Sequence, residues 1–384
     1  RARVAARFGN APSDLRVSDT EIAAARAACD PKLLAGIEQA AERIRVYHER
    51  QAAEERAPFW RDGHDGAWVG EESRAVDRAG CLVPGGLAPL ASTVLMTVIP
   101  ARVAGVGSIA VCATPGPGGI VHPATLAACA VAGADEVFAL GGPAAVAALA
   151  YGTESVAPAD VIVGPGSIWT TIAKHEVCMD VGVDSFAGPT EVAIVADDTA
   201  PPLFVAADLV AQAEHDPLAT AILITTSPEL VDAVERSLVG EVAAASRRDD
   251  IERALKDYGR VVIVEDLPRA IEVANFFAAE HLELMCRGAE ELVQQVRSAG
   301  AVFVGPCSPV ALGDYVAGTN HVLPTAGSAR FASPLRVSTF IRSTAIVAFE
   351  RRGLDGIADA LIALADAEGL DAHARALRVR MEQA

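Results

Sequence analysis

The chain has 384 residues, 51% of them hydrophobic, and a formal net charge of −18. Its length and apolar content predict a globular protein with a large core rather than a disordered one. The negative charge argues against nucleic acid as a partner, because a phosphate backbone binds basic surfaces. The longest apolar runs are far shorter than a membrane-spanning helix, so we expect no membrane span.

The 7 cysteines are scattered, with no C-x-x-C pair, and most have apolar neighbours. This pattern favours buried free thiols in a reducing compartment, so we expect a cytoplasmic protein. No signal peptide is visible. Because the chain starts at Arg1 rather than Met, we expect part of the native N-terminus to be missing.

The first segment, residues 1–81, is polar and predicts two helices, about 19–28 and 31–56, and then a loop or hairpin over 62–80. Ser18 and Glu21 have the spacing of a capping box, in which each side chain accepts a hydrogen bond from the backbone N–H of the other residue. We expect this segment to pack with residues 191–335.

Residues 82–190 alternate short apolar strands with alanine-rich helices. This βαβ rhythm predicts an α/β fold with a doubly wound parallel sheet, a Rossmann-like unit. The predicted strands are 108–113, 136–140 and 161–163, and the predicted helices are 122–132 and 144–151.

The same rhythm repeats in residues 191–335 and predicts a second Rossmann-like unit, with a site in the cleft between the two units. Residues 336–384 form a C-terminal helical tail that is split at Gly369 and is free to pack on a partner subunit. The predicted strands of the second unit are 192–196, 221–226, 260–264 and 301–304, and the predicted helices are 202–214, 229–245, 269–284 and 290–298.

Gln212 and His215 lie three residues apart at the end of a predicted helix, so they share one helical face and could hold one metal ion. The alternative is an ordinary helix C-terminus, where a histidine suits the helix dipole and a glutamine is solvated. A glutamine ligand needs oxygen or nitrogen partners from elsewhere. Asp314 and His321 are candidates, although both also fit ordinary polar loops.

Glu280 and His281 place an acid next to a histidine, a common arrangement for proton transfer. We predict that they lie near the end of helix 269–284. Neighbouring side chains on a helix point about 100° apart, so the two need not cooperate. His281 could equally be a buried, hydrogen-bonded core histidine.

Two glycine-rich turns, 141–143 (GGP) and 164–166 (GPG), follow predicted strands. Such turns let a phosphate or nucleotide approach the backbone closely. Neither turn has the full G-x-G-x-x-G pattern, so ordinary tight βα turns are the favoured interpretation of both.

Taken in order, these segments resemble the histidinol dehydrogenase family over nearly the whole chain. The matching stretches are 83–86 (VPGG), 151–154 (YGTE), 164–166 (GPG), 187–191 (AGPTE), 212–215 (QAEH), 279–283 (AEHLE), 313–315 (GDY) and 320–325 (NHVLPT). The resemblance implies an NAD-dependent oxidation of L-histidinol through L-histidinal to L-histidine, with NAD bound by residues 82–190.

The resemblance also implies a homodimer with shared active sites and a set of site residues. Glu280 and His281 match the acid/base residues of the family. The matching zinc ligands, which also contact substrate, are Gln212, His215, Asp314 and His373, the last donated by a partner subunit. Further positions that line the substrate site, beside His281, are Thr190, His321 and Glu368.

Three positions that contact NAD in the family depart from its pattern: Leu82 (usually Tyr), Ala144 (usually Gln) and Ser167 (usually Asn). The changes remove or shorten polar groups, so we expect a weakened or reshaped cofactor pocket. Two alternatives stay open: a paralogue that oxidises another small alcohol, such as sulfopropanediol, and a non-catalytic, zinc-stabilised dimer. Glu368 favours histidinol, because a carboxylate suits its ammonium group and would repel a sulfonate.

Overall fold

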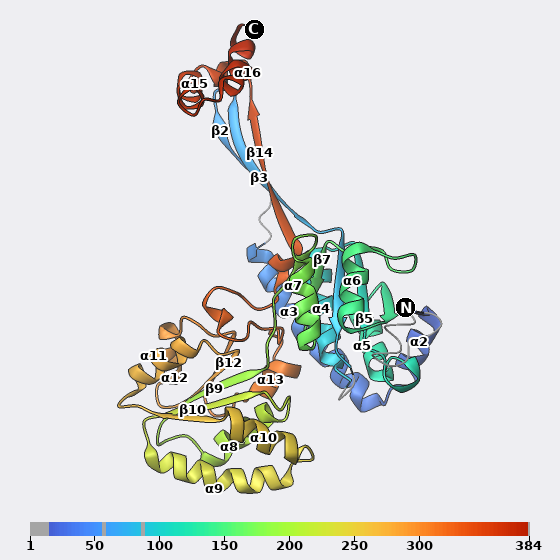
Figure 1. Cartoon of the computed structure of the whole chain (residues 1–384), viewed down its shortest axis with the longest axis vertical. Coiled ribbons are helices and arrows are strands. Elements are labelled where there is room, and N and C mark those ends of the chain that lie inside the picture. The colour runs from blue at the N-terminus through green and yellow to red at the C-terminus, as the bar shows by residue number, and fades with distance from the viewer. Residues whose placement is uncertain (1–14, 56–58, 86–88, 383–384) are drawn as a thin grey trace.

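The computed structural model describes residues 15–55, 59–85 and 89–382. Two α/β units lie side by side, and a thin arm leaves them and ends in the C-terminal helices (Figure 1). This arrangement confirms the predicted α/β class with two Rossmann-like units. In the described ranges, none of the helices is both long and apolar enough to cross a membrane.

The first unit is a six-stranded sheet in the order β1-β6-β5-β4-β7-β8, in which only β1 is antiparallel to its neighbour. Apolar side chains of α3, α4 and α5 cover one face, and those of α6 and α7 cover the other. The strands are β1 (Arg16–Val17), β4 (Arg78–Val83), β5 (Ser108–Ala113), β6 (Glu136–Ala139), β7 (Val161–Val163) and β8 (Gly182–Val183), and the helices are α4 (Ala91–Ala104), the 3-10 turn η1 (Pro117–Gly119), α5 (Pro123–Ala132), α6 (Gly142–Tyr151) and α7 (Ile168–Val177).

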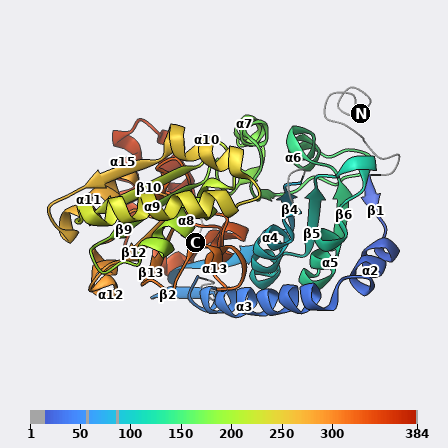
Figure 2. The same ribbon diagram turned by 90° about the horizontal axis from the view of Figure 1, so that it is seen from below.

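Helices α2 (Asp19–Ala27) and α3 (Pro31–Glu55) belong to this unit. Ser18 caps α2 in the predicted capping box with Glu21. We expected the N-terminal segment to pack with residues 191–335, and α3 does reach that range, where His48 Nε2 is 3.4 Å from Asn320 Nδ2. The segment also packs on the first unit: α2 contacts α5, and α3 contacts α4 and α5. The apolar side of α3, which includes Ile37 and Ile44, fills the core beside α4. Seen from below, α3 runs along the first unit (Figure 2).

The second unit is a fully parallel sheet in the order β11-β10-β9-β12-β13. Helices α8 and α9 share one hydrophobic core with it, and α11 and α12 share the core on the other face. The strands are β9 (Glu191–Ala196), β10 (Thr220–Thr225), β11 (Arg260–Ile263), β12 (His281–Met285) and β13 (Ala301–Val304), and the helices are α8 (Pro202–Ala213), α9 (Pro228–Ala244), α10 (Arg248–Tyr258), α11 (Leu267–Phe277), α12 (Ala289–Leu292), η2 (Val293–Gln295), α13 (Val310–Tyr315) and η3 (Ser328–Arg330). The 3-10 turn η4 (Val337–Phe340) packs instead in the core of the first unit, against α3 and α4.

The prediction of one helix over 269–284 is wrong. Helix α11 ends at Phe277, and Ala278 takes a left-handed conformation with φ of 51°. Strand β12 then begins at His281, so Glu280 and His281 lie at the start of an interior strand and not at a helix end. The sequence gives no signal for the end of α11, because an alanine occupies the capping position where a glycine is usual.

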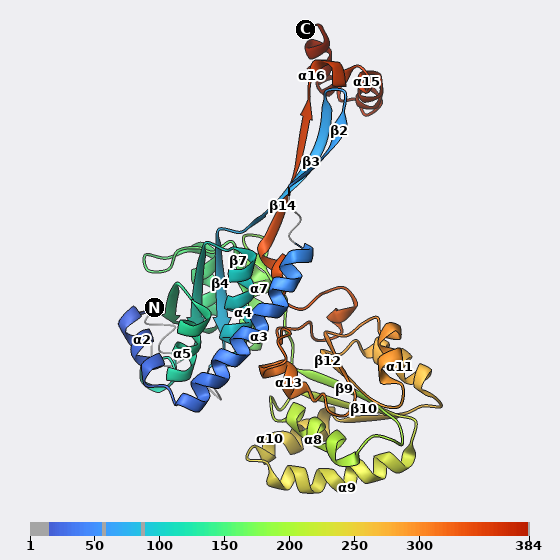
Figure 3. The same ribbon diagram turned by 180° about the vertical axis from the view of Figure 1, so that it is seen from behind.

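The arm is a three-stranded antiparallel sheet, ordered β14-β3-β2, that carries three helices at its far end (Figures 1 and 3). The expected hairpin exists, whereas the tail is not helical throughout, because β14 precedes its helices. Strand β14 is largely exposed, so it lacks the apolar alternation that predicts a strand. The elements are β2 (Trp60–His64), β3 (Ala67–Ala75), β14 (Ile341–Phe349), α14 (Arg351–Leu354), α15 (Ala358–Ala367) and α16 (Asp371–Glu382).

All seven cysteines are free, as the sequence suggested, but only Cys81, Cys112 and Cys129 are buried, and Cys307 is exposed. Gly369 takes a positive φ of 69° between α15 and α16, at the predicted break of the tail.

Candidate active site

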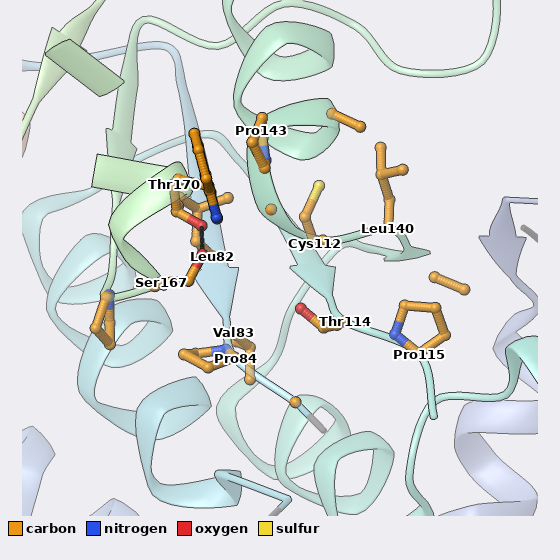
Figure 4. Close-up of a pocket in the computed structure, with 18 of the residues that line it drawn as sticks. Leu82, Val83, Pro84, Cys112, Thr114, Pro115, Leu140, Pro143, Ser167 and Thr170 are labelled. Atoms are coloured by element: carbon orange, nitrogen blue, oxygen red, sulfur yellow. Dashed lines mark hydrogen bonds between the residues drawn. The ribbon is translucent and has the colours of Figure 1, made fainter. Parts of the chain in front are cut away.

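A cavity of about 310 Å³ lies at the carboxyl ends of strands β4 to β7 in the first unit (Figure 4). Among the described residues that line it, none is charged. Hydroxyl groups come from Thr114, Ser167 and Thr170. The cavity lies beside the strand at which the winding of the sheet reverses, where parallel α/β sheets bind their ligands.

Both glycine-rich turns line this cavity, and helices α6 and α7 start from them. The N-caps of these helices, Gly141 and Ser167, form no side-chain cap bond, so backbone N–H groups at two helix starts are available to an anion. Leu82, Ala144 and Ser167, the three departures from the family pattern, all line the cavity. Uncharged walls and free backbone donors suit a dinucleotide.

A second, polar cluster begins with Thr190, which directly precedes β9. The Thr190 hydroxyl donates to Glu280 Oε2 over 2.5 Å and accepts from Gln212 Nε2 over 2.6 Å. The backbone N–H of Glu191 also donates to Glu280 Oε2. Burial raises the pKa of Glu280 to about 7 despite these bonds, so its carboxyl is partly protonated at neutral pH.

His281 lies beside Glu280 with Nδ1 3.6 Å from Glu280 Oε2 and 3.0 Å from the carbonyl oxygen of Glu191. A carbonyl only accepts, so we assign the proton to Nδ1, which leaves Nε2 as a free base. Nε2 is 4.0 Å from Asp314 Oδ1. Burial lowers the pKa of His281, so the ring is neutral at pH 7.

Asp314 connects this pair to two further histidines. Its Oδ2 is 3.9 Å from His215 Nε2, and the His215 side chain is half exposed. Its backbone carbonyl accepts from His321 Nδ1 over 2.9 Å. His321 Nε2 is 3.2 Å from the hydroxyl of Thr93, so it accepts from that hydroxyl and has no free nitrogen. Of the His281 and His321 rings, only His281 keeps a basic nitrogen available.

The predicted catalytic, metal-binding and substrate-binding residues therefore separate into two sets. The structure brings together Thr190, Gln212, His215, Glu280, His281, Asp314 and His321. Glu368 and His373 lie instead at the far end of the arm, away from both units (Figures 1 and 3). Within the described ranges, no three His, Cys, Asp or Glu side chains form a group that could hold a metal ion.

Sequence reasoning missed three residues around the cluster. Thr93, from α4 of the first unit, is buried and carries no motif. Glu283, buried on β12, pairs with the partly buried Asp208 on α8: burial, and then Asp208, raise the pKa of Glu283 to about 9. A glutamate inside the apolar run 282–285 was the available signal, because a buried acid needs a partner or a proton.

Known proteins match this chain over nearly its whole length. The family model described as histidinol dehydrogenase matches residues 2–381. Histidinol dehydrogenase from Heliobacterium mobile is 45% identical over 372 residues, which cover 97% of this chain and 86% of the relative. Histidinol dehydrogenase from Haloarcula marismortui is 47% identical over 382 residues, 98% of this chain and 89% of the relative.

Solved structures agree. Histidinol dehydrogenase from Elizabethkingia anophelis superposes with a TM-score of 0.90 at 35% identity, covering 97% of this chain and 85% of that one. An acetylating aldehyde dehydrogenase from Geobacillus thermoglucosidasius reaches a TM-score of 0.51 at 13% identity, over 86% of this chain and 96% of that one, which shows a shared fold alone. The chain belongs to the histidinol dehydrogenase family, a family of oxidoreductases.

Proposed function

We propose that the protein is a zinc- and NAD-dependent dehydrogenase that oxidises L-histidinol through L-histidinal to L-histidine in two hydride transfers. The observation that carries this proposal is the setting of His281. It is a neutral, buried imidazole with one free nitrogen, between Asp314 and a carboxyl whose pKa is about 7. Oxidation of an alcohol at neutral pH needs a positioned base of this kind.

The donor set of the cluster fits zinc. Gln212 Oε1 is buried without a hydrogen-bond partner in the described structure, a deficit that a metal ion would remove. Gln212, His215 and Asp314 supply oxygen and nitrogen donors, and zinc accepts both. When bound, zinc would anchor the amino and imidazole nitrogens of the substrate. A fourth donor is still needed, and we assign it to His373 of the partner subunit.

The protein's own residues then divide the proton transfers. His281 Nε2 accepts the hydroxyl proton of the alcohol as hydride passes from the carbon that bears this hydroxyl to NAD+. Water adds to the aldehyde, and the carboxylate form of Glu280 accepts its proton. A second hydride then passes from the carbon of this hydrate to a second NAD+, which yields the acid. Asp314 is held by His321, whose two nitrogens are both engaged, so His321 acts as a positioning residue.

For NAD we propose the cavity of the first unit. The helix starts at Gly141 and Ser167 suit the pyrophosphate, and the apolar walls suit the bases. The two edges lie close together, because Thr93, in the first turn of α4 at the cavity edge of the first unit, is 3.2 Å from His321 Nε2 in the cluster. This proximity supports hydride transfer between a substrate held by the cluster and a nicotinamide that leaves the cavity.

The arm supports a homodimer with shared active sites. Its strand β14 and helix α15 expose large apolar side chains, with Val347 69% and Leu364 66% exposed. Exposed apolar surface of this kind is typical of an interface. If the arm crosses to a second copy, His373 joins the zinc ligands there and Glu368 meets the ammonium group of the substrate.

The decisive test is an activity assay of the purified protein with NAD and a panel of small alcohols that includes L-histidinol and sulfopropanediol. We expect two NADH for each histidinol converted, and about one zinc per chain. His215→Ala should release the zinc and abolish substrate binding. Absence of turnover with histidinol would reject the proposed substrate, and full zinc retention in His215→Ala would reject the ligand assignment.

A further inference from the structure

Lys174 and Asp184 form an ion pair in the first unit in which each side chain is only 3% exposed. No other ion pair of a lysine or arginine in the described ranges is buried so deeply. A buried pair of this kind contributes little net stability, because two charges must leave water to form it. Its position gives it a more specific role.

The pair holds both backbone polar groups of Gly164. Lys174 Nζ donates to the Gly164 carbonyl over 3.2 Å, and Asp184 Oδ2 accepts from the Gly164 N–H over 2.7 Å. Gly164 follows β7 with φ of +105°, and a Cβ there would lie 2.3 Å from the carbonyl oxygen of Leu82. The ion pair therefore fixes the backbone of this turn at Gly164. The next three residues of the turn, Pro165, Gly166 and Ser167, line the cavity, whereas Lys174 and Asp184 do not.

Asp184 is also the first residue of the connection between the two units, residues 184–190. Asp184 Oδ1 accepts from the N–H of Ser185, and α7 holds the connection again where Thr171 donates to the Ala187 carbonyl over 2.8 Å. The connection ends at Thr190, which donates to Glu280. One helix, α7, therefore holds both the wall of the cavity and the segment that leads into the catalytic cluster.

We propose that Lys174 and Asp184 are positioning residues for the cofactor: they set the loop 164–167 against the dinucleotide and fix its distance from the catalytic cluster. This inference rests on the proposed function, because it takes the cavity to be the NAD site. It predicts that loosening the pair weakens NAD binding more than it destabilises the fold.

The test is the double variant Lys174→Met/Asp184→Leu, in the full-length protein. Replacing both charges avoids the large cost of one uncompensated buried charge, and removes both bonds to Gly164. The matched control is Arg78→Met/Glu136→Leu, which removes a partly buried ion pair at the opposite, amino edge of the same sheet. If the apolar pair does not fold, Lys174→Gln/Asp184→Asn replaces it, with a smaller effect expected in the same direction.

Three quantities are measured: hydrogen exchange at the amides of Gly164, Gly166 and Ser167 without ligand, the Kd of NAD from quenching of Trp169, which lines the cavity, and the KM for NAD. We expect faster exchange and a rise in Kd and KM on the order of tenfold, the change that ordinary hydrogen bonds produce. The KM for the alcohol should stay near its wild-type value. The control variant should keep the wild-type exchange rates, Kd and KM for NAD.

An unchanged KM for NAD, or an equal change in the control variant, would overturn the inference. If the wild-type protein bound no NAD, the proposed function would fail instead. The exchange measurement would still be decisive then: unchanged exchange at Gly164 would reject the positioning role, and faster exchange would support it.

Discussion

The two α/β units share one winding but carry their candidate sites on opposite edges. In the first unit the cavity lies at the carboxyl ends of the strands, where helices α6 and α7 begin. In the second unit the polar cluster lies at the amino ends of β9 and β12, where helix α8 ends. Helix starts carry partial positive charge and helix ends partial negative charge. The first edge therefore suits phosphates, and the second suits a metal cation.

This contrast predicts that the second unit performs the chemistry while the first only binds the cofactor. His281→Asn removes the free base but keeps an amide at the Nδ1 position. We expect turnover of the alcohol to fall roughly 10²–10⁴-fold, with NAD binding unchanged. His175→Asn, on the exposed side of α7, is the control for replacing a histidine. Comparable losses in turnover and in NAD affinity would contradict this division of chemistry and cofactor binding between the two units.

The arm extends the comparison to a second copy of the chain. His281→Asn and His373→Ala should each be inactive alone. Mixed dimers contain one site with both residues intact, so random re-mixing should restore about a quarter of the wild-type sites. The measurement is activity after dissociation and re-association. Mixed dimers that form but stay inactive would show that the tail folds back onto its own subunit.

Glu280 divides the two oxidation steps. Its pKa is about 7, so the carboxylate form, which accepts the proton of water, gains population as the pH rises through 7. We expect aldehyde oxidation to rise over the same range. Glu280→Gln should abolish that rise and slow aldehyde oxidation roughly 10²-fold, with a smaller effect on alcohol oxidation. Equal effects on both steps would contradict this role, and Glu290→Gln, an exposed site, is the control.

In the first unit the expected effects are smaller and concern affinity alone. Ala144→Gln with Ser167→Asn returns polar groups to the cavity wall. A gained hydrogen bond of about 0.5–1.5 kcal/mol should lower the KM for NAD roughly 2–12-fold without changing kcat. Ala147→Gln, on the exposed side of the same helix, should leave the KM unchanged. A changed kcat would mean that these positions touch the chemistry.

The smallest effect concerns Glu283, the buried acid on β12 that pairs with Asp208. The folded pKa of Glu283, about 9, lies above its ordinary value of 4.5. The stability that it contributes is therefore complete below pH 4.5 and is lost as the pH rises through 9. Glu283→Gln should reduce this alkaline loss by about 2–4 °C in Tm between pH 6 and pH 9. An identical fall in Tm for both proteins would show that Glu283 is not protonated in the folded state.

The elements with a clear local signal could be predicted. Short apolar runs identified the interior strands β5, β6, β7, β9 and β10, but not β4 or β12, and Ser18 with Glu21 identified the start of α2. The boundary at Ala278 could not be found, because its left-handed conformation depends on tertiary packing rather than on a glycine. Strand β14 was missed since a mostly exposed strand has no apolar alternation to reveal it.

The candidate site shows the same limit. Spacing suggested Gln212 with His215, and Glu280 with His281, but the contacts that join them come from distant segments. Thr190 connects Gln212 with Glu280 across 22 and 90 residues of sequence. No local sequence pattern predicts such a contact. Which nitrogen of His281 stays free depends on the Glu191 carbonyl, which only the folded sheet positions.

The arm also has a consequence for the order in which the protein forms on the ribosome. Its hydrogen bond between Ser73 and Ser343 joins residues 270 apart in sequence, and β14 pairs with β3 along its full length. Strand β3 is synthesised early, yet its partner emerges only after both α/β units are complete. Closing so long a loop is slow, so each unit has time to fold first. The arm is therefore the last part of the chain to form, and any step that depends on it follows the end of synthesis.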